Sequence, residues 1–195
     1  MKKVFGQVKV ANRSGFTLLE LLITVFILAV LAAIVLPRFR SSTLAAEEAA
    51  LRNTLFEMRN AIQLYYYQHN GAYPGFMKTD GTGVSTTEAE AQAAFLNQLT
   101  LFSDVNGKTD ITRDLKATPQ IKYGPYLKRS TLPSNPIDGG ALVTMVISTA
   151  ALGRLEDQPA APAAGDTGWW FDVASGKFVA YTPGNGSNGT AYYLW

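Results

Sequence analysis

We predict an α+β fold in which a long N-terminal helix, one half transmembrane and the other amphipathic, packs on a small antiparallel β-sheet. Three observations support this prediction. An apolar run covers residues 16–36, a helical pattern of apolar residues continues to about His69, and strand-like segments follow Ala141. The chain has 195 residues, of which 47% are hydrophobic and 16% charged, so it is too short for several large domains and too apolar to be disordered.

The first 15 residues form a basic leader. Four cations and no acid occur there, at Lys2, Lys3, Lys9 and Arg13. Because the whole chain carries a net charge of +2, the rest is slightly acidic. That distribution lacks the basic surface that nucleic acid requires, so no nucleic-acid partner is expected. The absence of cysteine excludes disulfides and cysteine metal sites.

Residues 16–36 have the length of a membrane span. A helix of these 21 residues would extend about 32 Å, which matches a hydrocarbon core of about 30 Å. A secretory signal peptide has a shorter apolar region, of roughly 7 to 15 residues. Because the cations precede the run, we expect a single-pass helix with its N-terminus in the cytoplasm and the rest of the chain outside.

Glu20 is the only charged residue of this run. An unpaired ionisable group in a membrane helix costs about 2.5–3.5 kcal/mol on insertion scales. One interpretation is that Glu20 lies shallow enough to reach the lipid headgroups. The other is that its carboxylate has a partner, and the residues around it favour this second interpretation.

The sequence "GFTLLE", which begins at Gly15 and follows the basic leader, resembles the class III signal of type IV pilin-like proteins. The resemblance implies that a prepilin peptidase cleaves between Gly15 and Phe16 and that the new amine of Phe16 is methylated. It also implies that Glu20 pairs with the amine of a neighbouring subunit during assembly. The acid would then favour a staggered register between subunits.

Residues 37–70 are predicted to continue the helix in amphipathic form. Pro37 removes one backbone hydrogen bond and is expected to kink the helix, or alternatively to mark its end. Apolar residues then recur at helical spacing and predict a face packed beneath a sheet. They are Leu44, Leu51, Leu55, Met58, Ile62 and Tyr66. Asn70 and Gly71 supply the left-handed conformations that end a helix.

Residues 71–195 are predicted to form a periplasmic globular domain with a helix, connector loops and a C-terminal sheet. The helix is expected over 87–104, with Thr87 as N-cap, Glu90 completing a capping box, and Phe95, Leu99 and Phe102 on its buried face. Strands are expected at 141–149, 169–173 and 177–182, the last two forming a hairpin through Ser175 and Gly176.

Two segments of this domain resemble the major, G-type pseudopilins of type II secretion. They are "NGAYP" after the first helix and "GPYL" continuing through "LP" to "NP" in the connector. The connector departs from the family at Asn135, where aspartate is frequent, and at Ile137-Asp138, which replace a tryptophan. That family also binds calcium in a C-terminal loop, but the corresponding tail here contains no carboxylate side chain. We expect no cofactor, with Asp166 and Asp172 as weak candidates for calcium ligands.

The sequence shows no constellation of catalytic residues, and its single histidine, His69, has no second ligand or nucleophile motif beside it. We therefore expect a structural subunit of a secretion pseudopilus in the bacterial inner membrane, not an enzyme. Its expected partners are further copies in a helical filament, the prepilin peptidase, the assembly platform and other pseudopilins. The alternatives are a type IV pilin of a surface pilus and a membrane-anchored binding module.

Overall fold

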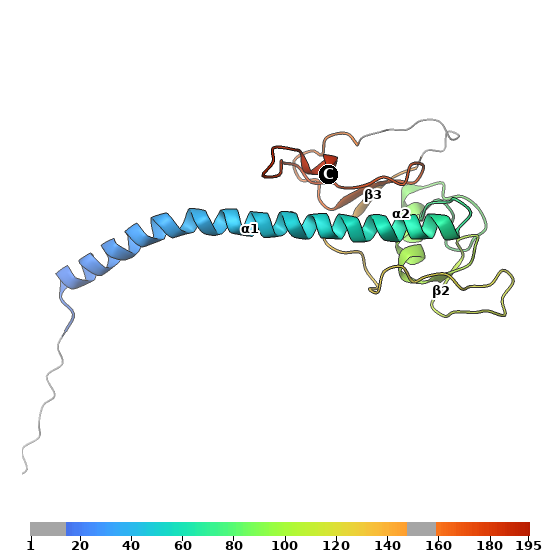
Figure 1. Cartoon of the computed structure of the whole chain (residues 1–195), viewed down its shortest axis with the longest axis horizontal. Coiled ribbons are helices and arrows are strands. Elements are labelled where there is room, and N and C mark those ends of the chain that lie inside the picture. The colour runs from blue at the N-terminus through green and yellow to red at the C-terminus, as the bar shows by residue number, and fades with distance from the viewer. Residues whose placement is uncertain (1–14, 148–158) are drawn as a thin grey trace, which may run out of the picture. The chain divides into compact units, whose positions relative to one another are not determined.

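The computed structural model describes residues 15–147 and 159–195, without the side chains of residues 35–42. The predicted leader at 1–15 therefore lies outside the described residues except for Gly15. The chain divides into two compact units, Met1–Thr43 and Leu44–Trp195. In the second unit, the C-terminal part of helix α1 (Leu18–Gln68), helix α2 (Glu88–Thr100) and a three-stranded sheet contribute to one hydrophobic core (Figure 1).

Helix α1 continues through Pro37, so the alternative that the helix ends at this proline is wrong. The predicted kink at Pro37 stays a prediction, because Pro37 is one of the residues whose side chains are not described. The apolar stripe is confirmed at Leu51, Leu55, Met58 and Ile62, which are all nearly inaccessible to solvent.

The two ends of the predicted stripe are wrong. Leu44 is 38% exposed, and Tyr65, not Tyr66, is fully buried at the C-terminal end. Tyr65 stacks on His69, with ring centroids 3.6 Å apart. Both residues follow Ile62 at the spacings of three and seven that keep one helical face toward the core. Asn70 and Gly71 end the helix with φ values of 54° and 77°, as predicted.

Helix α2 is capped as predicted at its first turn. The Glu90 amide donates to the Thr87 hydroxyl at 3.2 Å. The Glu90 carboxylate, however, accepts from the amide and hydroxyl of Thr86, one residue before the N-cap. The Thr86 amide is the main cause that lowers the pKa of Glu90 to about 2.

The C-terminal boundary predicted for this helix is wrong. Helix α2 ends at Thr100, and the following residues form strand β1 (Phe102–Ser103), which pairs with β2 (Thr109–Asp110). Phe95 and Leu99 are buried as predicted, but Phe102 lies in β1 and is only half-buried. It was not predicted from the sequence that the polar segment after this helix turns back on itself and pairs as β1 and β2.

The C-terminal sheet is mixed, in contrast to the antiparallel sheet predicted. Its order is β3 (Val143–Val146), β4 (Trp169–Asp172), β5 (Phe178–Ala180). Strands β4 and β5 form the predicted antiparallel hairpin, but β3 runs parallel to β4, with Met145 beside Phe171. A parallel pair needs a crossover of a dozen or more residues, and the segment between Val146 and Trp169 is long enough to provide it. The predicted end of the first strand, 148–149, lies outside the described residues.

Gly176 shows why the hairpin turn needs glycine. Its φ is 73°, and a Cβ at this position would collide with the ring of Tyr73. The turn therefore requires both the left-handed conformation and the missing side chain.

Trp169 lies at the centre of the core. It is fully buried, stacks on Phe178 with ring centroids 5.1 Å apart, and donates from its indole nitrogen to the Pro133 carbonyl at 2.8 Å. This hydrogen bond joins the proline-rich connector to the sheet.

Asn135 holds the same connector. Its amide nitrogen donates to the Gly168 carbonyl at 3.0 Å, and its amide oxygen accepts from the Ile137 amide at 3.0 Å. Because an ionised aspartate cannot donate, only an amide satisfies both bonds at this buried position. The departure from the family pattern at Asn135 therefore has a local physical reason.

Candidate assembly site

The predicted processing and assembly residues lie at the start of α1. The amide of Glu20 donates to the hydroxyl of Thr17 at 3.2 Å, so Thr17 caps the first turn of a helix that begins at Leu18. A role for Thr17 was not predicted. The spacing Thr-x-x-Glu, from Thr17 to Glu20, is a recognised capping signal and was available in the sequence.

Glu20 lies in this first turn with an exposed side chain. The positive end of the helix dipole favours an acid at this position. Among the side chains that the structure describes, which exclude those of residues 35–42, no cation lies within ion-pair distance of its carboxylate.

The side chains around Glu20 form a continuous exposed apolar surface. Phe16 is 73% exposed and Leu18 87% exposed, and every large apolar residue described from there to Ile34 is exposed. Exposed apolar surface on this scale marks a contact with lipid or with another protein.

No helix in the described part of the chain is both long and apolar enough to cross a membrane, so the predicted span over 16–36 is not confirmed. The last two residues of that predicted span, Val35 and Leu36, belong to the stretch whose side chains are not described.

Gly15 lies three residues before Leu18, where this helix begins. A Cβ placed on Gly15 would have no atom within 4 Å. Neither crowding by the described residues nor a left-handed backbone therefore requires glycine at this position.

The C-terminal tail that contains Ser187 corresponds to the loop in which the resemblance implies calcium binding. Glu48 of α1, only 2% exposed, accepts hydrogen bonds from the amide and hydroxyl of Ser187 at 2.6 and 2.7 Å. The bond from the Ser187 hydroxyl is the main cause that lowers the pKa of Glu48. Glu48 precedes Leu51 by three residues and so lies on the helical face that carries the apolar stripe, but no local signal in the sequence indicated its contact with Ser187.

The two candidate calcium ligands have local partners. The Asp172 carboxylate accepts from the Ala174 amide and the Ser175 hydroxyl, and Asp166 accepts from the Ala163 amide. Within the described ranges, no group of three or more His, Cys, Asp or Glu side chains is arranged to hold a metal ion.

The family model of the prokaryotic N-terminal methylation motif matches residues 10–36. This match includes Gly15, Phe16 and Glu20 and indicates a type IV pilin-like protein. In general, such a motif implies a membrane-anchored N-terminus, processing by a prepilin peptidase and assembly into a filament. The match does not distinguish a secretion pseudopilin from a subunit of a surface pilus. No curated protein and no solved structure matches the chain.

The mature protein is expected to begin at Phe16 with a methylated amine. Intact-mass and N-terminal peptide spectra of the protein from native membranes measure both features. Gly15→Val is the matched variant, because the open space around Gly15 tolerates a side chain, and it should keep its leader. Retention of residues 1–15 by the unaltered protein in assembled filaments would contradict the processing site.

Proposed function

We propose that this protein is a rod-forming structural subunit of a type II secretion pseudopilus. Subunits stored in the inner membrane are added at the base of the filament, and the growing rod pushes cargo protein outward. The proposal rests mainly on one observation, which is that Glu20 is the only acid of the apolar run 16–36, which begins directly after the Gly15-Phe16 junction and whose described large apolar side chains are exposed.

Cleavage at this junction would create a partner for Glu20. The new Phe16 amine is positively charged and lies at the start of the apolar helix. When two subunits are staggered, the amine of one meets the carboxylate of the next in a layer of low dielectric constant, where opposite charges attract far more strongly than in water. Each charge relieves the desolvation of the other, so the paired register is favoured over unpaired ones.

The role is mechanical and requires neither catalysis nor a cofactor. Its partners would be further copies of the chain, the prepilin peptidase, an inner-membrane assembly platform and other pseudopilins. The globular unit would lie in the periplasm, and no part would bind nucleic acid.

A type IV pilin of a surface pilus is the alternative, because it shares the same processing and pairing chemistry. The pseudopilus is favoured by the turn at Asn70-Gly71 and by the connector beginning at Gly124, which resemble pseudopilin segments. It is also favoured by the absence of the cysteine pair that many pilins carry near their C-terminus. The presence of Glu20 favours a rod subunit over a tip subunit.

Deletion of the gene is expected to remove secreted proteins from the culture medium and to leave them in the periplasm. Proteomic comparison of the two fractions, with the complemented strain as control, measures this effect. Electron microscopy of the cell surface supplies the second measurement. Normal secretion combined with the loss of surface filaments would favour the pilus alternative over the pseudopilus.

A further inference from the structure

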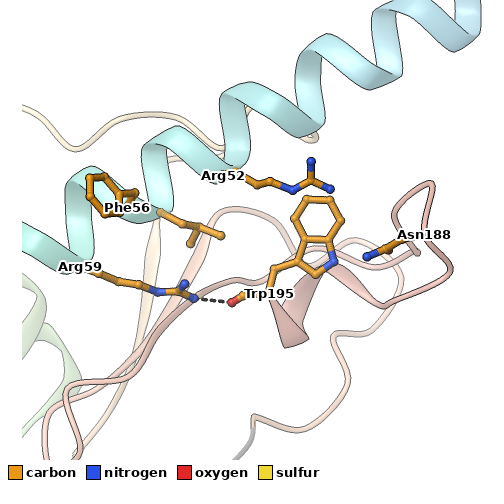
Figure 2. Close-up of a pocket in the computed structure, with 6 residues that line it drawn as sticks. Arg52, Phe56, Arg59, Asn188 and Trp195 are labelled. Carbon is orange, nitrogen blue, oxygen red and sulfur yellow. Dashed lines mark hydrogen bonds between the residues drawn. The ribbon is translucent and has the colours of Figure 1, made fainter.

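An open groove of about 390 Å³ lies between α1 and the C-terminal segment (Figure 2). Arg52, Leu55, Phe56 and Arg59 line it from α1, and Asn188 and Trp195 line it from the other side. All six residues belong to the second compact unit. The groove is therefore formed within one unit and does not depend on the placement of the other.

Two guanidinium groups give the groove a basic lining. The Arg52 guanidinium lies 4.4 Å from the centre of the Trp195 ring and 3.7 Å from the Glu48 carboxylate. Arg59 donates to the carbonyl of Phe178 at 2.9 and 3.0 Å and to the carbonyl of Trp195 (Figure 2). A guanidinium has five donors in a planar fork, so both groups keep donors for an incoming carboxylate.

The groove also exposes an aromatic ring. Phe56 is 69% exposed although it lies on the helix that carries the core stripe. A large aromatic ring beside two arginines is the composition found at the centre of protein–protein interfaces. A peptide segment that combines carboxylates with apolar side chains would complement it.

The chain itself carries such a segment, which we name the acidic edge and define as residues 78–90. It contains Asp80, Glu88 and Glu90 against the single cation Lys78, which pairs with Glu90 at 3.1 Å. Val84 between them is 46% exposed. The Thr82 amide bonds to Asp80 and lowers the pKa of its carboxyl group, so this exposed group stays ionised at neutral pH.

The groove and the acidic edge share no residue and are formed by different parts of the second unit. The groove is formed by residues 52–59, whereas the acidic edge follows the turn that ends α1. The nine residues from Arg59 to Gln68 alone correspond to about 14 Å of helix. A contact between two such different surfaces is heterologous, and it leaves a free groove on one copy and a free edge on the other.

We propose that the groove of one copy binds the acidic edge of the next copy, with Phe56 as its apolar anchor. This inference rests on the proposed function, because it requires that copies of the chain assemble. Arg52 and Arg59 pair with the carboxylates of the edge, and Val84 packs against Phe56. The unused surfaces at each end accept further copies, so the contact extends a filament and does not close a dimer.

Cross-linking of single-cysteine variants tests the contact directly, because the native chain contains no cysteine. Two differently tagged full-length chains are co-expressed, one with Phe56→Cys and the other with Val84→Cys, and native membranes are treated with a short bis-maleimide. We expect a product that carries both tags. The matched control pairs Phe56→Cys with Leu142→Cys, since Leu142 is also exposed, at 66%, and lies outside both surfaces. Equal yields from the two pairs would overturn the proposal, as would cross-linking of the Phe56→Cys chain to a different protein instead.

Two alanine variants separate this inference from the proposed function. Phe56→Ala should lower the yield of sheared filaments at least tenfold, whereas Tyr67→Ala should leave it unchanged. Both side chains are exposed aromatics on α1, at 69% and 74%, so neither change should affect folding. If the unaltered protein forms filaments and Phe56→Ala forms as many, the groove contact is wrong while the filament role stands. If the unaltered protein forms no filament, the proposed function itself fails.

Discussion

Replacement of Glu20 by alanine is expected to abolish filament assembly while the chain still inserts into the membrane. Removal of one partner from a charge pair in a low-dielectric layer costs about 3–5 kcal/mol, because the remaining charge stays desolvated without compensation. Here the stranded charge would be the Phe16 ammonium of the neighbouring subunit. Each 1.4 kcal/mol changes an association constant tenfold, so each contact should weaken by about two to four orders of magnitude.

The effect of Glu20→Ala on insertion and on assembly is measured in two cell fractions. Carbonate-washed membranes report insertion of the variant, which should be normal because removal of an acid makes the helix more apolar. Sheared filaments report assembly, and they should be absent. Thr24→Ala is the matched control, because Thr24 donates only to the Leu21 carbonyl of its own helix at 2.8 Å. A normal filament yield from Glu20→Ala would show that the acid has no pairing role.

Replacement of Trp169 by alanine should destabilise the globular unit by about 3–5 kcal/mol, the range observed when a large core aromatic is truncated. The indole fills the space beside Phe178, and its nitrogen supplies the hydrogen bond to the Pro133 carbonyl. The variant would also leave the Pro133 carbonyl without its indole donor, and a buried acceptor without a partner lowers the stability further. Native domains have a total stability of about 5–15 kcal/mol, so the variant should be close to unfolding at room temperature.

Urea unfolding of a fragment that begins at Leu44 measures this change, since that residue starts the second compact unit. The fragment should be soluble because its apolar stripe is covered by α2 and the sheet. Tyr67→Ala is the control, and its stability should stay within about 0.5 kcal/mol of the unaltered fragment because the side chain is exposed. Equal unfolding midpoints for the two variants would show that Trp169 does not hold the connector to the sheet.

Features that depend on neighbours in the sequence were predicted correctly. The end of α1 follows from Asn70 and Gly71, the start of α2 from the Thr87 hydroxyl, and the hairpin from the short turn at Gly176. The candidate site is also local in the sequence, because its junction and its acid lie within six residues, Gly15 to Glu20, where the methylation motif matches, but the roles of Gly15, Phe16 and Glu20 stay predictions. Each of these features depends on backbone geometry or side-chain contacts within a few residues of one another.

Only the tertiary structure decided three features: the direction of β3, the contact of Glu48 with Ser187 and the bonds of Asn135. Glu48 meets Ser187 across 139 residues, and β3 adds to β4 after a long crossover. A helical pattern shows which face is apolar, but it does not reveal that a distant loop returns to satisfy one acid, Glu48, on that same face. Local patterns record the preferences of single elements, whereas the pairing of distant elements depends on which arrangement buries the core and satisfies every buried polar group at once.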